Sequence, residues 1–381
     1  MARRVLIPLV LACLLAATLP GVAAAADPPL PSSMAAVGDS ITRAASSAGS
    51  LGSDAPQNSW STGTSSSVTS HYSRLLAAGA PISGQNHNRA VSGAKMVDLV
   101  GQMQAVVPLA PGYLTVLMGG NDLCTDTVGE MTDALVFRAQ FAAAMDTIAT
   151  GSPGTRVYVV SIPNVHQLWS LFKGNFWARL IWASAGICQS LLANPTSNEA
   201  ADVARRDAVA QRNVAYNAAL ASVCAGHATR CRFDGNAVFN TPFTSGDVSG
   251  DYFHPSVAGQ AKLAAVSWSA GYTWAPPAAV DMWVGSLTGT AAASKGSWTA
   301  TATIGVTSDG GAVGGVTVTA RWSTGATATC VTAGSGACQV TSAALGKKVT
   351  TVRLDVTGLA RTGYRHDATQ NAANSITFTR P

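Results

Sequence analysis

Up to about residue 275, short apolar runs alternate with longer segments of helical periodicity. The runs are bounded by Gly or Pro and rich in apolar or β-branched residues, so they predict buried strands over Met34–Val37, Tyr113–Met118, Arg156–Ile162 and Cys231–Phe233. The longer segments predict helices over Val68–Ala78, Met96–Val107, Met131–Thr150, Asn198–Ala225 and Ser256–Ala270. Strands that alternate with helices favour an α/β fold with a parallel sheet covered on both faces, and a binding crevice at the carboxyl ends of the strands.

The pattern changes after the segment Trp274-Ala275-Pro276-Pro277, where the chain becomes rich in Thr, Val, Gly and Ser. Apolar and polar residues then alternate, with Gly-rich turns between the alternating segments, which are Ser297–Val306, Gly315–Trp322, Lys348–Val356 and Asn374–Thr379. This pattern predicts a small β-sandwich. We therefore expect a first domain over 27–274, a linker over 275–280 and an all-β domain over 281–381.

The N-terminal 26 residues have the layout of a secretory signal peptide. Arg3 and Arg4 precede an apolar run from Val5 to Leu19, and Ala24-Ala25-Ala26 provides small residues at a cleavage site. An uncleaved anchor is the alternative, but the apolar run is shorter than the ~20 residues that span a membrane. We expect cleavage near Ala26 and an extracellular protein.

Composition and charge narrow the class of protein. Hydrophobic residues make up 47% of the 381 residues and charged residues only 11%, which excludes a disordered chain. Loss of the signal peptide lowers the formal charge from +5 to +3, and no dense basic run is present. The sequence therefore gives no reason to expect a nucleic-acid partner.

Six cysteines remain after removal of the signal peptide: Cys124, Cys188, Cys224, Cys231, Cys330 and Cys338. An even number in an exported chain predicts three disulfides, for which 15 pairings are possible. The close spacings favour Cys224–Cys231 and Cys330–Cys338, the latter clamping a hairpin, and leave Cys124–Cys188. A metal site is the alternative, but no paired Cys or Cys/His spacing supports it, and we expect no metal.

Two segments carry residues typical of nucleophilic catalysis. Ser40 follows the first predicted strand in a turn that Gly38 opens, and such a turn would expose its hydroxyl. Asp251 and His254 are three residues apart, so the carboxylate can reach one ring nitrogen while the other faces the serine. Taken alone, the segment with Ser40 could also be an ordinary loop. The segment with Asp251 and His254 could also be a helix-capping Asp beside a structural histidine.

Two further segments could stabilise an oxyanion. Gly93 lies between a strand and a helix, where a backbone N–H can face a substrate. Asn121 follows the strand Tyr113–Met118 after two glycines, and its amide can donate to a negatively charged oxygen. Plain turns are the alternative for both segments.

Taken together and in this order, the four segments resemble the SGNH subgroup of the GDSL hydrolases over about residues 33–272. The matching blocks are Gly-Asp-Ser at 38–40, Gly93, Gly-x-Asn-Asp at 119–122 and Asp-x-x-His at 251–254. The resemblance implies a flavodoxin-like three-layer α/β/α sandwich, a Ser40 nucleophile, a His254 base oriented by Asp251, and no cofactor. It also implies an oxyanion hole from the Ser40 and Gly93 N–H groups and the Asn121 amide. The strings at 119–124 and 253–256 look closest to the phospholipase-B-like branch and related secreted actinobacterial esterases.

The segment Leu168–Leu192 bears on the substrate, because it carries five aromatic residues among leucines and isoleucines. It could form an apolar wall for an acyl chain or a surface that meets lipid, or it could be a helical insertion packed on the core. We expect a lipase- or phospholipase-type esterase that acts as a monomer on small-molecule or lipid esters. The alternatives are a carbohydrate acetylesterase whose β-domain binds polysaccharide, and an inactive adhesive protein.

The all-β part resembles the Ig-like modules appended to secreted bacterial enzymes. Its tryptophans Trp283, Trp298 and Trp322 could form a binding platform or belong to the core.

Overall fold

A computed structural model describes residues 27–275 and 279–381, and the chain divides into two compact units between Ala275 and Pro276. The predicted signal peptide and residues 276–278 of the predicted linker lie outside the described residues. The first strand of the second unit begins at Val280.

The first unit is built on a five-stranded parallel sheet in the order β2-β1-β3-β4-β5. The strands are β1 (Met34–Gly38), β2 (Asn86–Asn88), β3 (Tyr113–Leu117), β4 (Arg156–Val159) and β5 (Cys231–Phe233). This is a flavodoxin-like order, and its direction reverses between β1 and β3. Ligands of such sheets bind at that point, outside the carboxyl ends of the strands.

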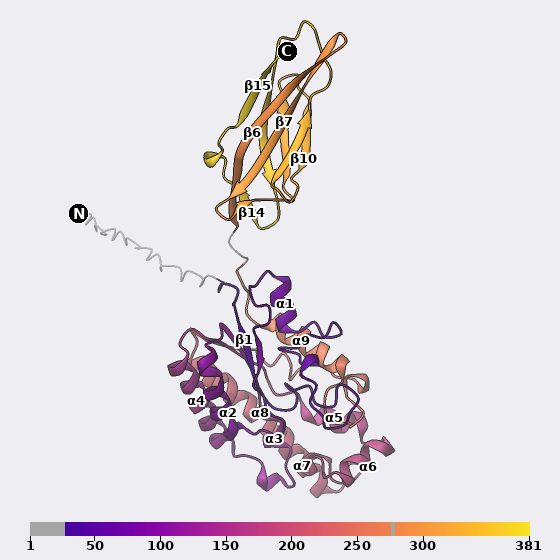
Figure 1. The fold of residues 1–381 in the computed structure, drawn as a ribbon. Coiled ribbons are helices and arrows are strands. Elements are labelled where there is room, and N and C mark those ends of the chain that lie inside the picture. Colours follow the sequence, from indigo (N-terminus) through magenta and orange to yellow (C-terminus); the bar gives the residue numbers. More distant parts are fainter. Residues whose placement is uncertain (1–26, 276–278) are drawn as a thin grey trace, which may run out of the picture. The chain divides into compact units, whose positions relative to one another are not determined.

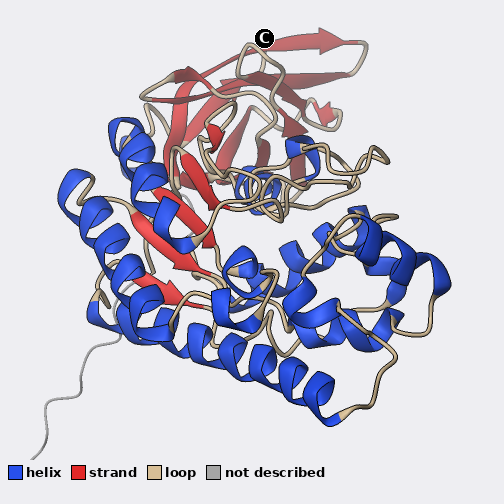
Figure 2. Cartoon of the chain, turned by 90° about the horizontal axis from the view of Figure 1, so that it is seen from below, coloured by secondary structure: helices blue, strands red, loops and turns tan. Residues whose placement is uncertain are grey.

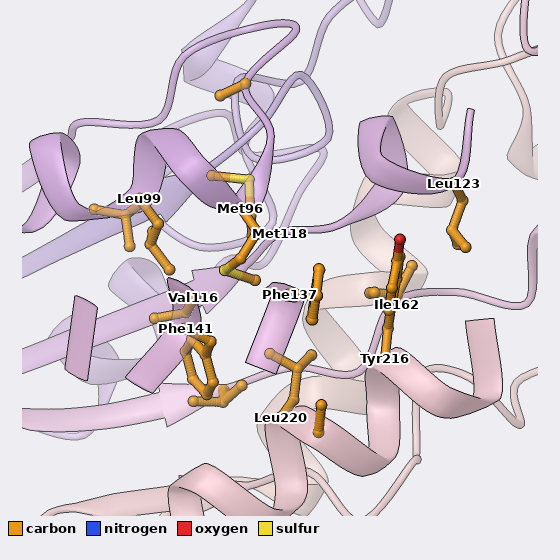
Figure 3. Close-up of a cluster of buried hydrophobic side chains, with 14 of the residues drawn as sticks. Met96, Leu99, Val116, Met118, Leu123, Phe137, Phe141, Ile162, Tyr216 and Leu220 are labelled. Carbon is orange, nitrogen blue, oxygen red and sulfur yellow. The ribbon is translucent and has the colours of Figure 1, made fainter. Parts of the chain in front are cut away.

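Helices cover both faces of the sheet, which confirms the predicted three-layer α/β/α fold (Figures 1 and 2). Strand residues such as Val37, Val116 and Val159 share a core with one group of helices: α2 (Leu99–Val106), α4 (Ala134–Gly151) and α8 (Ala200–Gly226). The alternate residues, such as Met34 and Tyr158, pack with α1 (His71–Ala77) and α9 (Val257–Ala270). Figure 3 shows the first core, in which Phe137 stacks on Tyr216 with ring centroids 3.9 Å apart.

The aromatic segment after β4 folds into three short helices, α5 (Val165–Phe172), α6 (Phe176–Ser184) and α7 (Gln189–Leu192). A disulfide from Cys188 to Cys124 joins this segment to the chain after α3 (Gly120–Leu123). Single 3-10 turns occupy Pro56–Asn58, Met96–Asp98, Val107–Leu109, Val128–Glu130, Ser245–Asp247 and Ala368–Gln370. None of the helices in the described ranges has the length and apolar character needed to cross a bilayer.

The second unit contains two β-sheets, which confirms the predicted all-β character. Its strands are β6 (Val280–Ser294), β7 (Ser297–Ser308), β8 (Gly311–Ala312), β9 (Thr317–Trp322), β10 (Thr327–Val331), β11 (Ala337–Thr341), β12 (Leu345–Gly346), β13 (Thr351–Ala360), β14 (Tyr364–His366) and β15 (Ser375–Thr379). One sheet has the order β10-β9-β13-β15, and the other has the order β11-β7-β6-β14, with β8 and β12 paired to β7. All pairs are antiparallel except β14 with β6.

All three predicted disulfide pairings are present, but the predicted hairpin clamp is wrong. Cys330 lies in β10 and Cys338 in β11, and these strands belong to different sheets, so the bond ties the two sheets together. Of the two alternatives for the tryptophans, a binding platform or the core, the core applies to two of the three. Trp298 and Trp322 are buried in the core between the sheets, and only Trp283 is partly exposed.

Candidate active site

The turn that carries Ser40 requires glycine where β1 ends. Gly38 has φ +145°, and a Cβ there would lie 2.2 Å from the carbonyl oxygen of Leu117 in the neighbouring strand. The buried Gln102 side chain of α2 makes two hydrogen bonds to the backbone of Gly38. Its Oε1 accepts the Gly38 N–H at 2.8 Å, and its Nε2 donates to the Gly38 carbonyl at 2.9 Å. The chain therefore turns sharply and places Ser40 just beyond the end of β1, at the reversal of strand order.

The structure brings Ser40, His254 and Asp251 into one hydrogen-bonded chain. His254 Nε2 lies 2.9 Å from Ser40 Oγ, and His254 Nδ1 lies 2.7 Å from Asp251 Oδ2. A carboxylate can only accept a hydrogen bond, so Nδ1 carries the ring proton and donates to Asp251. Nε2 is then free to accept a hydrogen bond from the Ser40 hydroxyl. Asp251 Oδ1 accepts the backbone N–H groups of Phe253 and His254, both at 3.0 Å, which fixes the carboxylate against the loop that leads into α9.

A fourth residue, Ser46, binds the same carboxylate oxygen of Asp251 that the His254 ring contacts. Its hydroxyl donates to Asp251 Oδ2 at 2.5 Å and accepts the Gly52 N–H at 2.8 Å. Burial tends to raise the pKa of Asp251, but hydrogen bonds from His254 and Ser46 hold that pKa below its ordinary value. Sequence reasoning did not single out Ser46, because it is one of many serines in the loop 44–67 and only the tertiary structure selects it.

Asn121 and Gly93 lie on neighbouring segments near Ser40. Asn121 lines the same cavity as Ser40 and His254, and its Nδ2 donates one N–H to the Ala94 carbonyl at 2.9 Å. That bond fixes the amide to the residue after Gly93 and leaves its second N–H available. Gly93 has φ +82°, is exposed, and does not line the cavity. Within residues 27–275, the backbone N–H groups of Ser40 and Gly93 donate to no protein acceptor.

Asp39, beside the nucleophile, is a buried carboxyl that the sequence did not single out. Its Oδ1 accepts the Ile41 N–H at 2.9 Å, and its Oδ2 has no hydrogen-bond partner among the described residues. Burial raises the pKa of Asp39 to about 6, even though the Ile41 N–H and His254 act in the opposite direction. The charge next to Ser40 therefore changes in the same mildly acidic range in which a histidine titrates.

The cavity next to Ser40 and His254 is predominantly apolar. Its lining comes from the turn after β1, helix α3, the segment after β4, helix α5, the loops before and after His254, and helix α9. The apolar members are Ile41, Ile162, Pro163, Val165, Leu168, Leu171, Phe243, Val248, Phe253, Pro255 and Leu263. Asn164, Gln167 and Asp247 also line the cavity, but most of its exposed surface is apolar, so it suits an uncharged, apolar portion of a ligand beside the polar cluster.

Outside the cluster around Ser40, His71 is a buried structural histidine. Its Nδ1 lies 2.8 Å from Tyr113 Oη and its Nε2 lies 2.8 Å from Ser267 Oγ. Since the Ser267 hydroxyl donates to the Leu263 carbonyl at 2.6 Å, its oxygen accepts from Nε2, and Tyr113 donates to Nδ1. No cluster of three or more His, Cys, Asp or Glu side chains that could hold a metal ion occurs in residues 27–275 and 279–381.

Comparison with known proteins identifies a family. A comparison with curated proteins finds no significant match. Among solved structures, the chain is similar to an extracellular lipase from Streptomyces rimosus (18% identity, 63% of this chain and 99% of that one, TM-score 0.38). It is also similar to a phospholipase A1 from Streptomyces albidoflavus (16%, 63% and 99%, 0.37) and a family 3 carbohydrate esterase from Clostridium thermocellum (17%, 63% and 94%, 0.38). The model of the GDSL-like Lipase/Acylhydrolase family matches residues 36–262. Because this match spans more than half of the chain, the protein belongs to the GDSL-like lipase/acylhydrolase family and is a carboxylic ester hydrolase.

Proposed function

We propose that the protein hydrolyses carboxylic esters through a Ser40–His254–Asp251 triad and an acyl-enzyme intermediate. The observation that carries this proposal is the continuous chain of contacts from Ser40 Oγ to His254 Nε2 at 2.9 Å and from His254 Nδ1 to Asp251 Oδ2 at 2.7 Å. Nε2 takes the hydroxyl proton as Oγ attacks the ester carbonyl, and Asp251 stabilises the imidazolium that forms. The imidazolium then protonates the leaving alcohol, and water activated by His254 hydrolyses the acyl-enzyme.

The negative charge that develops on the carbonyl oxygen needs donors that are already in place. We assign this role to the Ser40 and Gly93 N–H groups and the second N–H of the Asn121 amide. Two observations support this assignment. Within residues 27–275, the Ser40 and Gly93 N–H groups donate to no protein acceptor. The Ala94 carbonyl orients the Asn121 amide by accepting its first N–H. Loss of one such donor typically lowers kcat by about 10²–10³-fold, so Asn121→Ala should be impaired in kcat more than in KM.

The substrate we propose is an ester with a medium or long acyl chain, as in lipase or phospholipase substrates. The apolar lining contributed by α5 and the Phe243 and Phe253 loops supports an extended acyl group. A carbohydrate acetylesterase would need only a small pocket for an acetyl group. Chain-length dependence therefore separates the two substrates.

The test is a series of p-nitrophenyl esters from acetate to palmitate, with Ser40→Ala as the control. We expect kcat/KM to rise with acyl length beyond acetate, and we expect Ser40→Ala to lose at least about 10⁴-fold of the activity. Activity on acetate alone would favour the carbohydrate acetylesterase. Full activity in Ser40→Ala would overturn the triad.

We also propose an extracellular protein of the phospholipase-B-like branch, whose second unit is an Ig-like domain. The three disulfides support export, since such bonds persist in oxidising compartments. The sheet order β10-β9-β13-β15 has the arrangement of the C′-C-F-G sheet of Ig-like sandwiches, and β11-β7-β6 has that of strands E, B and A. Secretion of the full-length chain into the medium, with a mature N-terminus near residue 27, tests the export proposal.

A further inference from the structure

Helix α6 presents two neighbouring aromatic side chains to solvent. Phe176 and Trp177 are 61% and 62% exposed, whereas every other Phe, Trp and Tyr side chain in the described ranges is buried or partly buried. Leu180 one turn further and Leu171 at the end of α5 are exposed as well. These four residues, termed here the α6 patch, lie in a segment at the edge of the first unit (Figure 1).

The exposure of the α6 patch does not come from a loosely attached helix. The opposite face of α6 buries Ala178 and Trp182 in the core of the first unit. The indole N–H of Trp182 donates to the Tyr252 carbonyl at 3.0 Å, and the disulfide at Cys188 fixes the chain shortly after the helix. A firmly held helix with aromatic residues on its outer face is typical of a surface that meets another phase or partner.

The charge of this segment favours an anionic partner. From residue 165 to residue 198 the chain contains no Asp or Glu, and its only charged side chains are Lys173 and Arg179. Lys173 is exposed, and its Nζ lies 4.2 Å from the centre of the Trp169 ring, beside the first turn of α6. Aromatic residues at the level of lipid head groups, flanked by Lys and Arg, are the pattern by which proteins bind anionic lipid surfaces.

One member of the α6 patch belongs to the lining of the candidate active site. Leu171 belongs to the patch and also lines the cavity that contains Ser40 and His254. On the inner face, Trp182 contacts the carbonyl of Tyr252, which lies between Asp251 and His254. A lipid surface in contact with the patch would therefore lie at the rim of the cavity into which an acyl chain has to pass.

We propose that the α6 patch docks the enzyme onto an aggregated lipid surface that carries anionic head groups. The occupant is the lipid surface itself, with Phe176 and Trp177 inserted at head-group level and Lys173 and Arg179 facing the anionic groups. The proposal rests on the proposed function in one respect only, that an acyl chain leaves this surface for the Ser40 cavity. Docking itself requires no catalysis.

The test uses full-length Ser40→Ala protein, so that the lipid is not consumed, and sedimentation with two kinds of vesicle. One is pure phosphatidylcholine and the other contains phosphatidylglycerol. We expect binding to the anionic vesicles that falls at high salt, and at least about tenfold weaker binding when Phe176→Ser and Trp177→Ser are added. Lys173→Gln should weaken binding to anionic vesicles by about fivefold.

The matched control carries Leu135→Ser and Val136→Ser, which remove another exposed pair of neighbouring apolar side chains, at the start of α4. We expect this variant to bind as the parent does. Equal loss in both double variants, equal binding to both kinds of vesicle, or no binding at all would overturn the proposal.

Hydrolysis of soluble p-nitrophenyl butyrate separates this proposal from the proposed function. With Ser40 restored, the Phe176→Ser/Trp177→Ser variant should hydrolyse this ester as the unsubstituted enzyme does, which also shows that it folds. Hydrolysis of the soluble ester without vesicle binding would reject the docking surface alone. Vesicle binding without any ester hydrolysis would reject the proposed function alone.

Discussion

Replacing Ser46 with alanine removes one of the four hydrogen bonds that Asp251 accepts. The other three come from the Phe253 and His254 backbone and the His254 ring, so the Ser46 hydroxyl is the only one of these donors from outside residues 251–254. Hydrogen bonds to charged groups contribute about 1.5–3 kcal/mol. If the whole of this were felt in the transition state, kcat would fall by roughly ten- to a hundredfold.

We expect the lower end of this range, about a tenfold loss in kcat, because three donors still hold the carboxylate. KM should change little, since Ser46 does not line the cavity. The variant also removes a donor that keeps the pKa of Asp251 low, although burial of that carboxyl acts to raise it. A more basic Asp251 favours the imidazolium form of His254, so the acid limb of the kcat/KM profile should move to higher pH.

The assay is the pH dependence of p-nitrophenyl butyrate hydrolysis by Ser46→Ala and by Ser47→Ala. Ser47 is the matched control, because it is a buried serine of the same loop whose hydroxyl donates to the Ala44 carbonyl and not to Asp251. The reasoning is refuted if the two variants have kcat within twofold of each other and the same acid limb. Thermal unfolding of both variants separates an effect on stability from an effect on the triad.

Two further predictions concern stability. Burial lowers the pKa of His71 to about 3, whereas an unfolded histidine titrates near 6.5, so the unfolded state binds the extra proton between these values and stability is lost as the pH falls through this window. This group should therefore lower the free energy of unfolding by about 3 kcal/mol between pH 7 and pH 4.5, and urea unfolding of His71→Gln should show a correspondingly smaller pH dependence, with His87→Gln as the control. Parallel pH dependences in the parent and His71→Gln would contradict this. Removal of the Cys124–Cys188 bond, which spans 64 residues, should cost about 4 kcal/mol, against about 2.5 kcal/mol for Cys224–Cys231, which spans 7. Urea unfolding of the two double Cys→Ala variants measures both values, and the reverse order would show that native-state effects dominate.

The parts of the fold that were predicted correctly are those whose signal lies within one segment. Strand β1 was predicted within one residue, because a fully buried parallel strand has an uninterrupted apolar run. Helix α9 was predicted to begin at Ser256, which is its N-cap and accepts the Gly259 N–H. Strand β2 was not among the predicted strands, because Asn86-His87-Asn88 has no apolar pattern and pairs along one edge of the sheet.

The residues of the candidate site also differ in whether a single segment of sequence reveals them. Asp251 and His254 could be chosen because a spacing of three residues lets them meet within one turn of the chain. Ser46 could not be chosen, since its contact with Asp251 spans 205 residues of sequence. The Cys330–Cys338 pairing was predicted correctly, but its location in a hairpin was not. A separation of eight residues can close a hairpin or cross between two sheets equally well.

The glycine that opens the Ser40 turn has a consequence for how such enzymes diverge. A side chain at position 38 would collide with the carbonyl oxygen of Leu117, so the glycine is required by the fold whether or not a reaction takes place. A descendant of this protein that lost Ser40 would keep Gly38 under selection for folding alone. It would still match much of the motif by which active members are recognised. Gly38 therefore marks common ancestry, whereas Ser40, His254 and Asp251 together are the residues by which an active descendant can be told from an inactive one.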